Sequence, residues 1–206
     1  MVSKLKEELA KRQDLVEISK MIESGTRVLD LGCGNGVFLK LLEYEKNVKG
    51  LGIEICQQQI IESIATGIPV VHGDLNHDLD FAEDSSFDYV VLSRTLQEVQ
   101  RPDRLLSEIV RVGKRAIVSF INFGYYKTRF QLMLTGTMPE TKNLPYHWYD
   151  TPNIHLGTLK DFRMLCKEMD IRILRELPLG NQRKIFTKVI PNLFAPMCIF
   201  EIRKGG

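Results

Sequence analysis

The chain has 206 residues, of which 44% are apolar and 26% are charged, and its net charge is +2. These values are typical of one soluble globular domain, and the near-neutral charge gives no reason to expect a nucleic-acid or membrane partner. No apolar run approaches the roughly 18 residues of a membrane span, and the charged N-terminus does not resemble a signal peptide. We therefore expect a cytoplasmic protein, and the spacing of its cysteines and histidines predicts neither disulfides nor a metal site.

The first 24 residues predict an N-terminal helix. Apolar side chains recur among charged ones from Ser3 to Ile22, which is the pattern of an amphipathic helix. Ser3 is a residue type that often caps a helix. We expect one continuous helix here, with Ser3 as its N-cap.

From Gly25 onward, short apolar runs alternate with helical stretches, a pattern typical of a parallel α/β sheet. The expected strands are 27–31, 48–55, 69–72, 87–93, 115–120, 172–177 and 198–203. The expected helices are 37–44, 57–66, 102–112 and 158–169, the last with Thr158 as cap and Asp161 three residues on. A single domain over 1–206 is the simplest organisation.

Two connections differ from the rest of the chain. Residues 121–157, between the fifth strand and the last helix, mix many aromatic side chains with basic ones. Connections of this length are usually functional lids or binding loops. The alternative is a helix and loop that merely cover one end of the sheet. The other connection, 178–197, contains Pro191 and Pro196 and predicts an irregular excursion.

A Gly-rich turn follows the first strand in the segment RVLDLGCGNGVFLKLL. Gly32, Gly34 and Gly36 allow a tight turn and a close approach of a ligand to the backbone. A dinucleotide fingerprint would have its third glycine at position 37, where this chain has Val37. The spacing therefore opposes a nicotinamide-dependent oxidoreductase.

Acidic residues mark the ends of three expected strands: Asp30, Glu54 and Asp74. Ligands of open α/β sheets bind at this edge. Carboxylates there suit ribose hydroxyls, an adenine amine, an amino group or a sulfonium, and they repel phosphates. Asp74 has an alternative role as the cap of the turn that follows it. Asp88 begins the fourth strand, which places it at the opposite edge.

With these residues the chain resembles the class I S-adenosylmethionine-dependent methyltransferases and, more narrowly, the MetW family of methionine-biosynthesis proteins. The segments that carry the resemblance are RVLDLGCGNG, GLGIEI, HGDL, FDYVVLSRTLQEVQRPD, VGKRAIVSF, NFG and LPYHWYDTPNIH. The first is shared by many methyltransferases, and the last is the specific part of the match. The resemblance implies a Rossmann-like α/β fold with a seven-stranded sheet in the order 3-2-1-4-5-7-6 and an antiparallel strand seven.

The resemblance also implies a site for S-adenosylmethionine or S-adenosylhomocysteine. Asp30 and the glycines would hold the methionine moiety, Glu54 the ribose, Asp74 with Leu75 the adenine, and Ser93 with Leu96 the methyl-donor side. The full predicted set is Asp30, Gly32, Cys33, Gly34, Gly36, Glu54, Ile55, Asp74, Leu75, Ser93 and Leu96. On the substrate side, Arg94 and Ile121 stand where the family pattern has glutamine and proline.

Methyl transfer is an in-line displacement that depends mainly on proximity and orientation, and it needs a base only when the acceptor must lose a proton. His147, Tyr149 and His155 are the candidates for that base, although the segment around them is alternatively a rigid turn. The catalytic residue stays open.

Two functions follow from the resemblance. In the first, the chain is a cofactor-binding protein of methionine biosynthesis that supports or regulates a homoserine O-acyltransferase of the MetX type, and its aromatic-rich stretch is an interface. In the alternative, it is an active methyltransferase acting on an unidentified small molecule, with residues 121–157 as the substrate cover.

Overall fold

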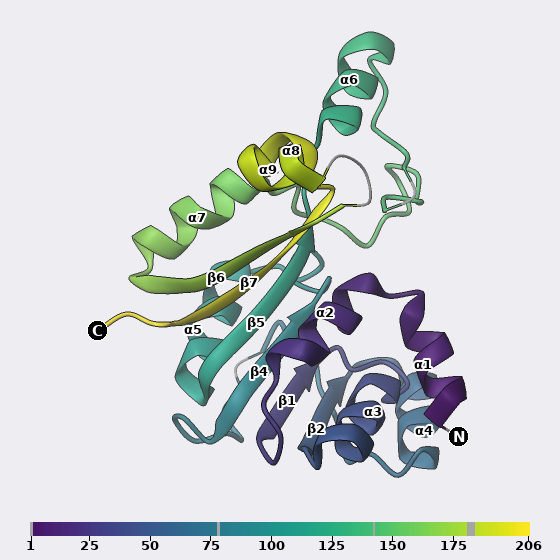
Figure 1. Ribbon diagram of the computed structural model, residues 1–206, viewed down its shortest axis with the longest axis vertical. Helices are drawn as coiled ribbons and strands as arrows, with labels where there is room; N and C mark the ends of the chain where they lie inside the picture. The colour runs from purple at the N-terminus through teal and green to yellow at the C-terminus, as the bar shows by residue number, and fades with distance from the viewer. Residues whose placement is uncertain (1, 78, 142, 181–183) are drawn as a thin grey trace.

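The computed structural model describes residues 2–77, 79–141, 143–180 and 184–206 (Figure 1). Within these residues the chain forms a seven-stranded sheet in the order β3-β2-β1-β4-β5-β7-β6. Strands β1 to β5 pair in parallel, and β7 is antiparallel to both β5 and β6, which confirms the predicted topology. The strands are β1 (Arg27–Leu31), β2 (Lys49–Glu54), β3 (Val70–His72), β4 (Phe87–Ser93), β5 (Gly113–Ile121), β6 (Ile171–Leu179) and β7 (Met197–Lys204).

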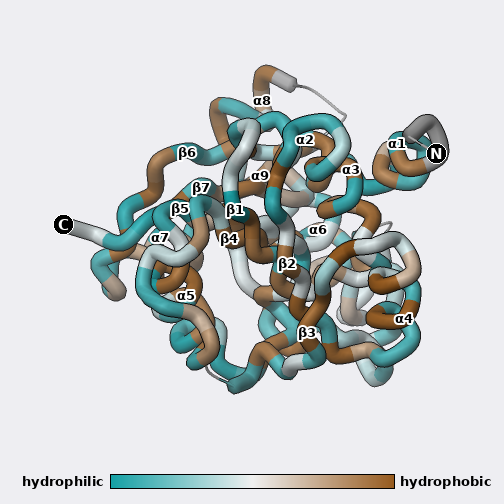
Figure 2. Tube along the Cα trace, turned by 90° about the horizontal axis from the view of Figure 1, so that it is seen from below, coloured by the Kyte–Doolittle hydropathy of each residue, from teal (hydrophilic) through white to brown (hydrophobic). Residues whose placement is uncertain are grey.

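Helices cover both faces of the sheet (Figure 1). One face carries α1 (Val2–Ala10), α2 (Gln13–Met21), α3 (Val37–Lys46) and α4 (Gln57–Ala65). The other carries α5 (Pro102–Val112) and α7 (Leu159–Glu168). Figure 2 shows the same two layers from below, with hydrophobic strands between them.

The two faces are covered separately because neighbouring side chains of a strand point to opposite sides of a sheet. Val28 and Val91 pack under the N-terminal helices, whereas Leu29 and Val90 pack against α5 and α7. Strands buried on both faces read as continuous apolar runs. This is why the central strands were predicted almost to the residue.

The N-terminal helix is not continuous, so that prediction was wrong. Helix α1 ends at Ala10 and α2 begins at Gln13, because Arg12 between them has non-helical backbone angles of φ −112° and ψ 78°. The guanidinium of Arg12 turns instead to Asp14 and Ser93. Position 3 lies inside α1, so Ser3 is not the N-cap.

The two long connections contain helices. The irregular excursion predicted over 178–197 was wrong for the described part of this connection, because α8 (Lys184–Val189) and α9 (Pro191–Phe194) form there, the latter with Pro191 at its first position. Residues 121–157 contain α6 (Tyr126–Thr135), which projects from the body of the molecule (Figure 1). Thr158 caps α7 in a capping box with Asp161, as predicted.

In the part of the chain that the structure describes, no helix combines the length and apolarity needed to cross a bilayer.

Candidate functional site

The Gly-rich loop joins β1 to α3 at the carboxyl edge of the sheet. Gly32, Gly34 and Gly36 have φ values of +75°, +58° and +74°, in the left-handed region that other residues adopt at a cost of about 1 kcal/mol or more. A Cβ atom on Gly36 would also lie 2.5 Å from the hydroxyl of Ser63 on α4. The shape of this loop therefore requires glycine.

Several N–H groups of the loop are hydrogen-bonded to other groups of the protein. Gly32 and Cys33 donate to the carbonyl of Ile53 at 2.8 and 3.1 Å, and Gly34 donates to the Glu54 carboxylate at 2.9 Å. A phosphate-binding loop leaves such groups free to hold phosphate oxygens. The loop is thus not built for a phosphate, in agreement with its glycine spacing.

Glu54 is a rigid acceptor at the end of β2. Its carboxylate accepts hydrogen bonds from the N–H groups of Gly34, Ile55 and Cys56 at 2.9 to 3.0 Å. An ionised carboxylate has about four acceptor positions, so these bonds leave room for a further donor. Glu54 therefore links the Gly-rich loop to the start of α4 and retains some acceptor capacity.

Asp30 is buried on β1 and lines a cavity of about 240 Å³ over the loop. Among the described residues, no side-chain hydrogen bond reaches its carboxylate. Burial raises the pKa of Asp30 to about 7; the charge of Arg12 opposes this rise and that of Glu54 adds to it. A desolvated acceptor that faces a cavity suits a cationic ligand.

Part of the predicted cofactor set lines this cavity. These residues are Asp30, Gly32, Cys33, Gly34 and Ser93. Burial raises the pKa of the Cys33 thiol to about 12, so this side chain is protonated at neutral pH and acts as a small apolar group.

The other predicted residues, Glu54 among them, lie outside the cavity lining. Leu96 packs in the core between the sheet and α5. Asp74 accepts hydrogen bonds from the backbone and side chain of Asn76, which is the turn-capping role that the sequence left open. Ile55 is exposed, and Leu75 packs against the core. Gly36 lies at the N-cap of α3.

The N-terminal helices roof the cavity, and the sequence did not predict this. Glu8, Leu9, Arg12 and Leu15 line it, and the Asn35 side chain in the loop donates to the Glu8 carboxylate at 2.8 Å. An amphipathic pattern indicates that one face of a helix is buried, but it does not indicate which part of the protein that face packs against. The two helices reach the site through tertiary contacts alone.

A buried ion network borders the cavity, centred on Asp14. This fully buried carboxylate accepts hydrogen bonds from Arg12 at 2.9 and 3.1 Å, from Arg94 at 3.0 Å and from Ser93 at 2.8 Å. Although burial opposes ionisation, the bonds and charges of Arg12 and Arg94 hold the pKa of Asp14 below its usual range. The Ser93 hydroxyl is also 3.0 Å from that of Ser119. Ser93 is therefore held by protein partners.

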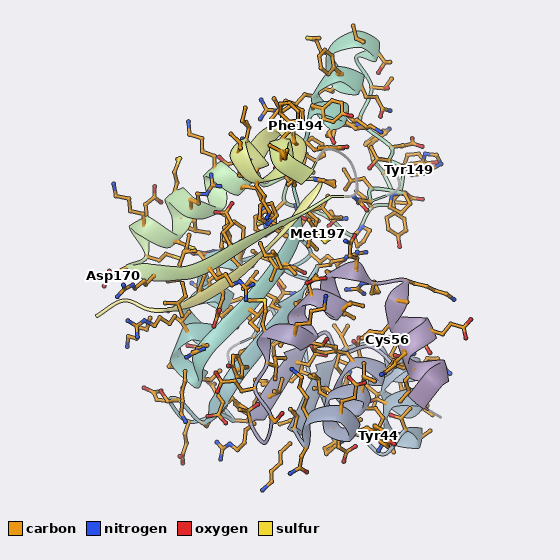
Figure 3. All side chains as sticks on the ribbon, in the orientation of Figure 1. Tyr44, Cys56, Tyr149, Asp170, Phe194 and Met197 are labelled. Atoms are coloured by element: carbon orange, nitrogen blue, oxygen red, sulfur yellow. The ribbon has the colours of Figure 1, made fainter. Side chains whose placement is uncertain are left out.

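The candidate bases lie away from both the cavity and the network. His147 pairs with Glu140 at 2.9 Å, which raises the pKa of the imidazole, and its ring stacks on Tyr149. Nε2 of His155 lies 3.3 Å from the carbonyl oxygen of Gln100. Tyr149 points outward (Figure 3). The roles of these three residues stay predictions.

Known proteins resemble this chain in sequence and in fold. The family described as "Methionine biosynthesis protein MetW" matches residues 12–202. The bifunctional methionine biosynthesis protein MetXA/MetW of Rhodopirellula baltica is 36% identical over 202 residues. The match covers 93% of this chain but 32% of that protein, so the chain spans about a third of its relative.

Two solved structures show the same fold at low identity. The S-adenosylmethionine-dependent methyltransferase of Mesorhizobium loti has a TM-score of 0.66 at 18% identity, over 90% of this chain and 94% of that one. The [4+2]-cyclase SpnF has a TM-score of 0.64 at 17% identity, over 95% and 81%. The fold thus occurs in a protein named for a cyclisation, and it does not by itself establish methyl transfer.

Proposed function

Because the chain belongs to the MetW family of methionine-biosynthesis proteins and has the class I methyltransferase fold, we propose that it binds S-adenosylmethionine over its Gly-rich loop and supports a homoserine O-acyltransferase. One observation carries the cofactor part of the proposal. Asp30 is a desolvated carboxylate without a hydrogen-bond partner among the described residues, and it faces a cavity beside a loop unsuited to phosphate. An ammonium or sulfonium group would compensate its charge.

The residues present fit this cofactor. Asp30 and the backbone of the loop would hold the methionine moiety, and the free acceptor capacity of Glu54 would serve the ribose hydroxyls. The roof formed by α1 and α2 would exclude water from the cavity. When bound, S-adenosylmethionine supplies an electrophilic methyl group.

Gly34→Ala should lower cofactor affinity at least tenfold, and Gly25→Ala should leave it unchanged. Both glycines have positive φ, +58° and +75°, so both variants should lose about 1 kcal/mol of unfolding free energy. A Cβ on Gly34 meets only the Gln59 side chain at 3.5 Å, and one on Gly25 meets nothing within 4 Å. Calorimetric titration with S-adenosylmethionine and S-adenosylhomocysteine measures the affinity. Equal cofactor affinities of the two variants would show that the Gly-rich loop is not part of the cofactor site.

The surface that fits a protein partner lies on α6 and the chain that follows it, and we call it the arm surface. Its exposed apolar side chains are Phe130, Met133, Leu134, Trp148 and Tyr149. Large aromatic side chains of this kind are enriched in interfaces and at their energetic centres. The relative from Rhodopirellula joins a MetXA part and a MetW part in one chain, which supports the acyltransferase as the partner.

Adding the protein to a MetX-type homoserine O-acyltransferase from the same organism should raise the rate of acyl transfer. Measuring the rate with and without S-adenosylmethionine shows whether the cofactor regulates this effect on acyl transfer. The double variant Trp148→Ala/Tyr149→Ala should weaken the effect at least fivefold and keep its cofactor affinity. Tyr44→Ala, at an exposed tyrosine on α3, is the control (Figure 3). No change of rate in any arm would exclude the partner role and favour the search for a methyl acceptor.

A further inference from the structure

A second and larger cavity, of about 600 Å³, lies beside the first. Its volume is in the range of small-molecule sites. Its lining includes segments far apart in the chain: the α1–α2 junction, the residue after β4, the end of β5, the base of α6, the end of β6, and α9 with the start of β7. Figure 3 shows Phe194 and Met197 at this end of the sheet.

The cavity carries an excess of positive charge. Lys11, Arg94 and Lys127 are the cationic side chains in its lining, and Asp14 is the acidic one. Asp14 already accepts hydrogen bonds from Arg12 and Arg94, so its charge is compensated. Within the described part of the chain, Lys11 and Lys127 have no salt-bridge partner. An anion entering this cavity would therefore meet uncompensated cations.

The guanidinium of Arg94 has hydrogen-bond donors that are not used within the described part of the chain. Its guanidinium makes one hydrogen bond, from Nη2 to Asp14, and its Nε has no partner among the described residues. Its backbone has φ +66°, an uncommon conformation for a residue other than glycine, held by a hydrogen bond from its N–H to the carbonyl of Ser119. Such conformations are retained where the surrounding structure imposes them, often at binding sites.

The rest of the lining is mainly apolar and aromatic. It includes Tyr125, Tyr126, Phe130, Leu193, Phe194 and Met197. Apolar walls with a few placed polar groups are what a site for an amphipathic small molecule requires.

We propose that this cavity binds a small organic anion, a carboxylate on an apolar body. Lys11, Arg94 and Lys127 supply the positive charge that attracts the carboxylate, and the aromatic side chains of the lining supply the apolar surface for the body. The inference deepens the proposed function, because Asp14 and Arg94 line this cavity while Arg12 and Ser93 of the same network line the cofactor cavity. The network around Asp14 thus lies between a ligand in this cavity and a cofactor in the first one.

The test uses pairs of probes that share a skeleton and differ in charge: hexanoate and hexanamide, phenylacetate and phenylacetamide, 4-phenylbutyrate and 4-phenylbutyramide. Each is titrated calorimetrically into the full chain without S-adenosylmethionine. We expect at least one carboxylate to bind tenfold more tightly than its amide. Because no cofactor is present, failure of cofactor binding and failure of this inference are separate results.

The double variant Lys11→Gln/Lys127→Gln should reduce that preference at least fivefold. Both side chains are on the surface, so the variant should fold. Lys160→Gln/Lys167→Gln on α7 makes the same change of net charge outside the lining of the cavity and should keep the preference. The inference is overturned if no carboxylate is preferred over its amide, or if both double variants lose the preference equally.

Discussion

Asp30→Asn should stabilise the ligand-free protein at pH 8 and remove most of its affinity for S-adenosylmethionine. The folded protein holds the carboxyl group of Asp30 in a buried position, where its pKa is raised from 3.8 to about 7. At pH 8 the group is ionised at a cost of about 4 kcal/mol relative to the unfolded chain, since each pKa unit corresponds to about 1.4 kcal/mol. Asparagine has the same shape and carries no charge, so it avoids this cost.

The sign of the pH dependence follows from proton binding. Between pH 4 and 7 the unfolded chain has released the proton of Asp30, but the folded chain still holds it. Stability must therefore fall as pH rises through this window, and it should level off above pH 7. Asp30→Asn should abolish this contribution. Denaturant unfolding from pH 4 to 8 measures it in both proteins.

Asp88→Asn is the matched control, because its effect on stability should have the opposite sign. Asp88 accepts hydrogen bonds from the N–H of Arg27 and from Lys114, and these hold the pKa of its carboxyl group below the usual value. Asp88 therefore stabilises the fold above about pH 4, and its replacement should cost stability there without changing cofactor affinity. An Asp30→Asn protein that keeps full affinity, or one that is no more stable at pH 8, would contradict our assignment of Asp30.

Asp14→Ala should reduce the unfolding free energy by about 3–5 kcal/mol, the usual loss when one member of a buried ion network is removed. The substitution leaves the partly buried guanidinium groups of Arg12 and Arg94 without their shared carboxylate. It also breaks the bond from Ser93, which ties the start of α2 to the end of β4. Urea unfolding at pH 7 measures the loss.

The chain also contains an exposed pair of the same geometry, which lacks the further bonds that Asp14 accepts from Ser93 and Arg94. Arg101 contacts Asp103 through the same two nitrogens and at the same spacing of two residues as Arg12 contacts Asp14, but both of its members are exposed. Exposed pairs contribute about 0–1 kcal/mol, so Asp103→Ala should cost far less. Similar losses in the two variants would show that the Asp14 network adds no more than a surface pair.

The contribution of Asp14 to the unfolding free energy should disappear at acidic pH. Its pKa is lowered in the folded state, so the stabilisation is present above the unfolded value near 4 and is lost as pH falls through the folded value. The wild-type protein and Asp14→Ala should therefore converge in stability at low pH.

The local sequence pattern was sufficient to predict the strands of the sheet and the Gly-rich loop. Central parallel strands are buried on both faces, so their apolar runs mark them directly in the sequence. The glycines of the loop are needed for backbone angles that the structure shows, and their spacing already opposed a dinucleotide. The capping box at Thr158 is likewise encoded within four consecutive residues.

The sequence by itself therefore determined the order of elements, the sheet topology implied by the family resemblance, and the position of the Gly-rich loop. Only the tertiary structure decided which polar groups face a cavity. Asp30 lies near the end of β1 and Asp74 just after β3, but folding leaves the first without a hydrogen-bond partner among the described residues and engages the second in its own turn. The helix break at Arg12 and the network around Asp14 escaped prediction, because their partners Ser93 and Arg94 lie about 80 residues away. Periodicity reports on neighbours along the chain, whereas an ion network forms between groups that only folding brings together.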